Sequence, residues 1–214
     1  MKPTAILLLL TLSLAPADAG QSDPIDDIVR EEMTSQRIPG MAVAVIRRGP
    51  STSPGASEVI KAQGYGLANV EHNAAVTPQT IFQSGSLGKQ FTAAAVMLQV
   101  EDGKLSLTDS LSKFFPNAPE SWRAVTVRHL LTHTSGIPDY NDGLLDYRKD
   151  YSEDDLAKFA MTLPLDFTPG AEWKYSNTGF QLLGIIAGKV SGSFYGDVLR
   201  DRVFKPLGMT TARI

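Results

Sequence analysis

The feature that most constrains the fold of this chain is a change in hydrophobic spacing near residue 85. Two short apolar runs with β-branched residues come first, at 41–46 and 58–66, and a stretch rich in Ser, Pro and Gly at 49–56 separates them. These runs predict the two strands of a hairpin, the first of them buried. After residue 85, apolar residues recur at helical intervals. A hairpin followed by helices predicts an α+β fold, with an antiparallel sheet flanked by helices and a helical region.

Capping residues and apolar spacing place the expected helices. Asp23 and Pro24 suit the start of a helix that precedes the hairpin and ends near Gln36. The later helices are expected after Ser86 up to Gly103, at 126–133, from 152, from 176 or 177 to 190, and at 195–204. We divide the chain into a leader at 1–19 and a partial domain at 20–214. Within that domain the hairpin and the helix after Ser86 occupy about 20–102, and a mostly helical region occupies about 103–214.

The first residues have the composition of a signal peptide. Lys2 gives the positive start, residues 5–14 are apolar, and Ala17 to Ala19 match a small-residue cleavage pattern. The apolar stretch is too short to span a bilayer stably. We therefore expect a periplasmic or secreted protein that has no stable membrane span after cleavage.

Composition excludes several classes of chemistry and partner. The 214-residue chain has no cysteine, so it has neither a thiol nucleophile nor a cysteine metal site. Its net charge is −3 with both signs interspersed, and the short runs at 47–48 and 200–202 are no basic patch for nucleic acid. We expect no cofactor and no nucleic-acid partner.

Ser86 and Lys89 form the strongest candidate for a catalytic pair. A lysine three residues after a serine lies one helical turn away on the same face, where it can assist loss of the serine proton. A helix N-terminus also favours an oxyanion. The alternative is a helix-capping serine beside a solvated lysine. A second copy of the spacing, Ser110 to Lys113, precedes two prolines and predicts an ordinary cap or loop serine.

Two histidines raise the alternative of a metal hydrolase. His129 and His133 are four residues apart, which is the spacing of two zinc ligands on one helical face. However, Leu130 stands where a zinc protease has its glutamate base. We therefore interpret the pair as structural and assign no metal ligands.

Tyr175 and Asn177 form a second candidate pair, after a turn at 169–174 and before a helix. A tyrosine near positive charge can act as a general base, and an asparagine amide can orient a substrate carbonyl. Taken alone, the pair is also typical of a capped helix start.

Four segments in this order resemble the serine β-lactamase-like family, which includes class C β-lactamases, D-alanyl-D-alanine carboxypeptidases, D-aminopeptidases and related esterases. They are Ser86 to Ala93, His129 to Gly136, Tyr175 to Gly179 and Phe204 to Met209. The resemblance implies a β-lactamase/transpeptidase-like fold. It implies that Ser86 is the acylated nucleophile, Lys89 its proton partner, Tyr175 the general base and acid at the leaving group, and Asn177 a substrate and network contact. The implied partner is a small-molecule or peptide substrate, namely a β-lactam, a D-amino-acid peptide or an ester.

The chain departs from the family pattern in one respect. The family has a Lys or His, one residue, then Gly on a later strand, and this sequence contains no such triplet. We therefore expect a C-terminally truncated member whose last strands are missing. The alternatives to a serine hydrolase are a catalytically inactive secreted binding protein of the same fold and an inactive fragment.

Overall fold

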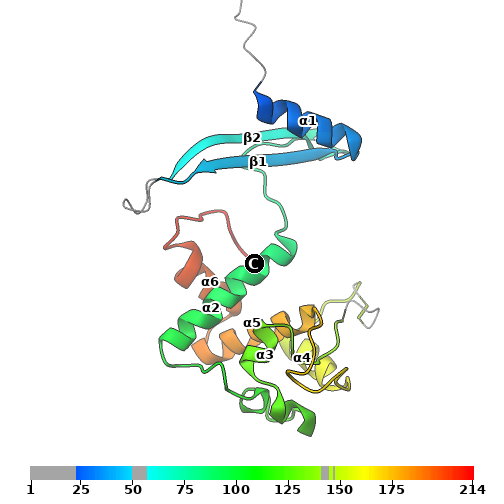
Figure 1. The fold of residues 1–214 in the computed structure, drawn as a ribbon, viewed down its shortest axis with the longest axis vertical. Coiled ribbons are helices and arrows are strands. Elements are labelled where there is room, and N and C mark those ends of the chain that lie inside the picture. The colour runs from blue at the N-terminus through cyan, green and yellow to red at the C-terminus, as the bar shows by residue number, and fades with distance from the viewer. Residues whose placement is uncertain (1–22, 50–56, 141–144, 147) are drawn as a thin grey trace, which may run out of the picture. The chain divides into compact units, whose positions relative to one another are not determined.

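The computed structural model describes residues 23–49, 57–140, 145–146 and 148–214 (Figure 1). The chain forms two compact units, Met1–Phe82 and Gln83–Ile214. The helix after Ser86 packs on the long helix at 177–191, so it belongs with the second unit. The boundary therefore lies between Phe82 and Gln83, whereas the sequence grouped that helix with the hairpin. The expected leader at 1–19 and most of the expected turn at 49–56 lie outside the described residues.

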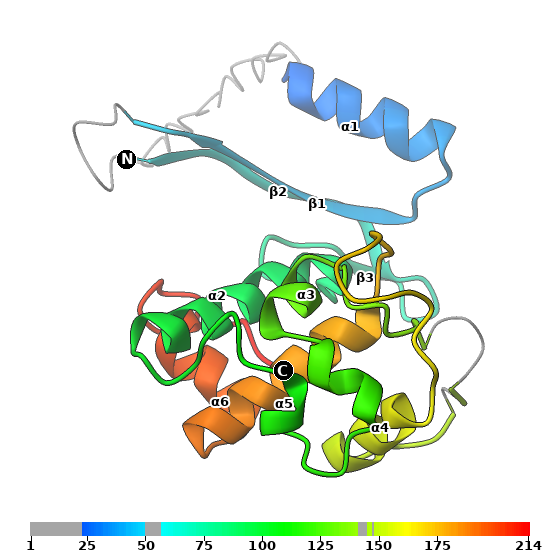
Figure 2. The same cartoon turned by 60° about the horizontal axis from the view of Figure 1, so that its bottom comes forward.

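In the first unit a helix lies beside a three-stranded antiparallel sheet (Figures 1 and 2). Asp23 caps the helix by accepting from the Ile25 N–H, as predicted. Lys61 in the sheet forms ion pairs with Asp23 and Asp26 and ties the helix to one face of the sheet. The elements are α1 (Pro24–Ser35), β1 (Gly40–Arg47), β2 (Glu58–Asn69) and β3 (Ala74–Ala75), and the strand order is β1-β2-β3.

The strand expected to be buried is only half covered. Met41 and Val45 of β1 are half-buried, and their partners on β2, Tyr65 and Lys61, bind carboxylates of α1. Ile46 is 61% exposed. The prediction of a buried strand is wrong, because alternate side chains of a strand point to opposite faces and α1 covers one face.

The second unit is helical and is organised around α5 (Asn177–Ser191). Leu182, Leu183 and Ile186 of α5 are at most 1% exposed. This helix packs on α2, α3, α4 and α6, and Figure 2 shows α2 beside it. The other elements are η1 (Gly85–Gly88), α2 (Lys89–Glu101), η2 (Leu111–Lys113), η3 (Glu120–Ala124), α3 (Val127–Leu131), α4 (Glu153–Met161), α6 (Tyr195–Leu199) and η4 (Arg200–Phe204).

Ser110, the serine of the second Ser-x-x-Lys sequence, makes the hydrogen bonds expected of a helix cap. The Ser110 hydroxyl accepts from the Ser112 N–H at the start of η2 and donates to the Arg123 carbonyl. The Ser110 side chain therefore links η2 to η3 through hydrogen bonds.

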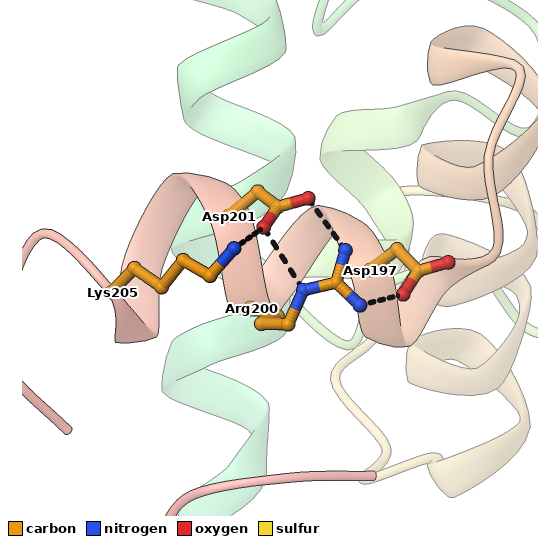
Figure 3. A network of polar contacts seen from close by, with 4 residues as sticks. All are labelled: Asp197, Arg200, Asp201 and Lys205. Atoms are coloured by element: carbon orange, nitrogen blue, oxygen red, sulfur yellow. Dashed lines mark hydrogen bonds and ion pairs between the residues drawn. The ribbon is translucent and has the colours of Figure 1, made fainter. Parts of the chain in front are cut away.

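Four charged residues at 197–205 pair with one another. Figure 3 shows Arg200 between Asp197 and Asp201, with Lys205 also bound to Asp201. The nearby cations hold the pKa of the Asp201 carboxyl well below its usual range, chiefly through the hydrogen bond from Arg200. Exposed pairs of this kind contribute little to stability. None of the helices in the described part of the chain is both long and apolar enough to cross a membrane.

Candidate active site

Ser86 and Lys89 lie where a short 3₁₀ turn continues into α2. Gly85 begins the turn with a φ of +52°, a left-handed conformation that suits glycine. The helical spacing brings Lys89 Nζ to 3.3 Å from Ser86 Oγ, to which it donates. Ser86 is exposed and Lys89 is half-buried.

Tyr175 and Asn177 meet this pair from the start of α5. Ser176 caps that helix by accepting from the Gly179 N–H at 3.1 Å. The cap fixes the residues on either side of it: Tyr175 Oη lies 2.6 Å from Ser86 Oγ, and Asn177 Oδ1 accepts from Lys89 Nζ at 2.6 Å. The structure thus brings together all four candidate residues, although almost 90 positions separate the two pairs in the sequence.

The electrostatics favour Tyr175 as a proton acceptor. The pKa of Tyr175 lies below its ordinary value, chiefly because of its polar interaction with Lys89 and then because of its hydrogen bond with Ser86. The Lys89 ammonium lies 4.8 Å from the centre of the tyrosine ring. A nearby cation stabilises the phenolate, which is the form that can accept a proton from a serine hydroxyl.

His133 joins this group, although the sequence indicated only a structural role. Its ring stacks on Tyr175 with centroids 4.7 Å apart, and its Nδ1 accepts from the Ser176 N–H at 3.1 Å. Burial, and then the charge of Lys89, hold the pKa of His133 below its ordinary value, while Asp139 opposes the shift.

The backbone at His133 corrects the expected helix at 126–133. Helix α3 ends at Leu131, and His133 has a left-handed φ of +58°. His129 remains in the helix, where its Nδ1 accepts from the Thr126 N–H. The two imidazoles therefore do not occupy one helical face as zinc ligands would. Within the described residues, no three His, Cys, Asp or Glu side chains are grouped closely enough to hold a metal ion.

Asp139 is the second residue of the site that sequence reasoning missed. Its side chain is buried, and its Oδ2 accepts from Asn177 Nδ2 at 2.9 Å. No spacing rule links positions 139 and 177. The only signal in the sequence was the turn at Gly136 to Pro138, which predicts a loop but gives no partner.

Comparisons with known proteins show the family to which the chain belongs. A protein-family model described as Beta-lactamase matches residues 25–214. The chain therefore belongs to the beta-lactamase family, and the predicted β-lactamase/transpeptidase-like α+β fold is confirmed.

Two curated relatives are similar over most of this chain. Penicillin-binding protein 4* of Bacillus subtilis (strain 168) is 34% identical over 73% of this chain and 36% of its own length. A beta-lactamase of Escherichia coli (strain K12) is 32% identical over 96% of this chain and 52% of its own length. This chain thus spans about a third to a half of the length of these relatives.

Two solved structures also align with most of this chain. The octameric penicillin-binding protein homologue from Pyrococcus abyssi aligns with a TM-score of 0.72 at 35% identity, over 86% of this chain and 42% of that one. The D-amino acid amidase from Ochrobactrum anthropi SV3 aligns with a TM-score of 0.69 at 28% identity, over 83% of this chain and 47% of that one.

Proposed function

We propose that this chain carries the acylation site of a serine hydrolase, in which Ser86 forms a covalent ester with the acyl part of an amide or ester substrate. The observation that carries the proposal is the position of Ser86 Oγ, 2.6 Å from Tyr175 Oη and 3.3 Å from Lys89 Nζ. A serine hydroxyl is a weak nucleophile until a neighbour takes its proton. Here a tyrosine with a lowered pKa and a lysine both contact the same oxygen.

Acylation would proceed in two proton-coupled steps. The Tyr175 phenolate takes the proton of Ser86 Oγ while that oxygen attacks the substrate carbonyl carbon. The carbonyl oxygen gains the negative charge, and backbone N–H groups at the start of a helical segment favour such an anion. When the bond from the carbonyl carbon to the leaving nitrogen or oxygen breaks, Tyr175 returns the proton to the leaving group and becomes phenolate again.

Deacylation would use the same groups with water as the nucleophile. Tyr175 takes a proton from water as the water oxygen attacks the Ser86 ester. The bond between the carbonyl carbon and Ser86 Oγ then breaks, and Tyr175 gives its proton to that oxygen. Lys89 remains a hydrogen-bond donor to Ser86 throughout, and Asn177 holds Lys89 in place.

The proposed substrates are β-lactams, D-amino-acid peptides or amides, and simple esters. The names of the relatives support β-lactams and D-amino-acid amides, because they include a penicillin-binding protein, a beta-lactamase and a D-amino acid amidase. All of these substrates present a carbonyl carbon to Ser86. We also propose that the protein is exported to the periplasm or secreted, on the composition of residues 1–19.

The test is covalent labelling of Ser86. The purified chain is incubated with a fluorophosphonate probe or with a penicillin, and its peptides are analysed by mass spectrometry. We expect a label on Ser86 that is absent from Ser86→Ala and retained by Ser110→Ala, the matched change at the second Ser-x-x-Lys sequence. No label on Ser86 in a folded preparation would contradict the proposal and favour an inactive binding protein of the same fold.

A further inference from the structure

The Asn177 amide has only one orientation that satisfies both of its neighbours. Lys89 Nζ can only donate while it is an ammonium, so it requires the amide oxygen at 2.6 Å. On the other side, the Asp139 carboxylate can only accept, so it requires the amide nitrogen at 2.9 Å. A rotation of the amide by 180° would place an NH₂ group against the ammonium and a carbonyl against the carboxylate.

The loop that carries Asp139 is held firmly against the start of α5. The Tyr140 N–H donates to Thr178 Oγ1 at 3.0 Å, and the Asp166 N–H donates to the Gly136 carbonyl at 2.8 Å. Gly136 has a φ of +75°, and a Cβ there would lie 2.2 Å from the Phe167 carbonyl oxygen. The carboxylate therefore occupies a place that the backbone determines, and the start of a 15-residue helix favours negative charge there.

We propose that Asp139 is a positioning residue: it fixes the Asn177 amide, whose carbonyl then anchors Lys89 between Ser86 and Tyr175. This role rests on the proposed function only in its catalytic consequence. The anchoring itself concerns the free protein and can be measured without a substrate.

The anchor accounts for the placement of a flexible side chain. A lysine side chain has four rotatable bonds, and ordering it costs conformational entropy. The Lys89 ammonium donates to Asn177 Oδ1 at 2.6 Å and to Ser86 Oγ at 3.3 Å, so its contact with the amide is the shorter one. Without Asp139 the amide can turn, the ammonium loses its anchor, and the cation that stabilises the Tyr175 phenolate moves away.

Two substitutions separate this role from a plain effect of charge. Asp139→Asn removes the charge but keeps an oxygen that can accept from Asn177. Asp139→Ala removes both the charge and the acceptor. If the alanine variant does not fold, Asp139→Leu takes its place, because leucine has nearly the shape of aspartate and offers no acceptor. Asp166→Asn is the matched control, because it removes a carboxylate from the neighbouring loop that pairs with Lys174 instead.

The readout is the pH titration of the Tyr175 ring, followed by NMR in protein with ¹³C-labelled tyrosine and assigned by the signal that Tyr175→Phe lacks. Among the described residues, Lys89 and His133 contact this ring, and the charge of Asp139 acts to raise the pKa of Tyr175. Loss of the Asp139 charge alone should therefore lower the pKa of Tyr175. Loss of the anchor raises it, by about one pH unit, because the phenolate loses its nearby cation.

We expect the Tyr175 pKa to rise in Asp139→Ala, to stay or fall in Asp139→Asn, and to match the parent in Asp166→Asn. A fall in both Asp139 variants would overturn the anchoring role and leave a through-space charge effect. An unchanged value in Asp139→Ala would overturn it as well.

Labelling of Ser86 by the fluorophosphonate probe tests the catalytic consequence separately. We expect Asp139→Ala to slow labelling at least tenfold more than Asp139→Asn does. Equal labelling rates in the parent and Asp139→Ala would overturn the catalytic consequence of the anchor, whereas the Tyr175 titration decides the anchoring itself. If the Tyr175 pKa changes as expected among the variants but Ser86 of the parent protein is not labelled, the proposed acylation would be contradicted and the anchoring role would stand.

Discussion

His133 makes the stability of the protein sensitive to acid, and the direction of the effect follows from its contacts. Its pKa is lowered from an ordinary value of 6.5, first by burial and then by the charge of Lys89. Because the folded-state pKa is the lower one, the unfolded chain gains its proton first as the pH falls. The stability that depends on neutral His133 is therefore complete above about pH 6.5, and its loss is complete once the pH has fallen through the folded-state value.

Two substitutions divide the functions of the imidazole. His133→Phe keeps a ring against Tyr175 but leaves the buried Ser176 N–H without its Nδ1 acceptor, at a cost of about 1–3 kcal/mol. His133→Asn keeps an acceptor near the position of Nδ1 and loses the stacking, which is worth about 0.5–1.5 kcal/mol. The left-handed φ of +58° also suits asparagine better than phenylalanine.

Urea unfolding at pH 8 and at pH 5 measures both effects. At pH 8 we expect the free energy of unfolding to be highest in the parent, lower in His133→Asn and lowest in His133→Phe. Between pH 8 and pH 5 the parent should lose more stability than either variant, because only the parent has a titrating group at this position. An equal loss in the parent and His133→Phe would refute the assignment of the acid sensitivity to His133.

Two further predictions concern the loop and the metal alternative. Gly136→Ala should lower the free energy of unfolding more than Gly192→Ala. At both positions an alanine would be forced into a left-handed φ, which costs about 1–2 kcal/mol. Only at Gly136 would the new Cβ also meet a backbone oxygen, that of Phe167 at 2.2 Å. Urea unfolding compares them, and an equal cost would contradict the close contact. Labelling of Ser86 should be unchanged by a metal chelator, because Nδ1 of His129 and of His133 each accept a backbone N–H; loss of labelling would revive the metal hydrolase.

The parts of the site that the sequence predicted are those that local geometry determines. Ser86 and Lys89 lie within one helical turn, so their spacing in the sequence gives their spacing in the fold. Ser176 caps a helix whose apolar residues repeat at helical intervals, and this places Tyr175 and Asn177 on either side of the cap. Only the resemblance to a family implied that the two pairs act in one site, because their meeting depends on the packing of α2 against α5.

What the sequence did not predict depends on contacts between distant segments or on unusual backbone conformations. Asp139 reaches Asn177 only because its loop turns at Gly136 and binds the start of α5. His133 has a left-handed φ and lies beyond the end of α3. Its spacing of four residues from His129 therefore does not place the two side chains on one helical face. The exposure of Ile46 depends on which face of the sheet α1 covers, and an apolar run does not reveal this.

If Tyr175 and Lys89 act on Ser86 as one unit, a double-mutant cycle will show it. The second-order rate constant for fluorophosphonate labelling of Ser86 is measured in the parent, in Tyr175→Phe, in Lys89→Met and in the double variant. We predict that each single change slows labelling by about 10²- to 10⁴-fold and that the double variant is no slower than the slower single variant. Effects that multiply in the double variant would show that the two residues act on Ser86 independently, and would refute their action as one unit.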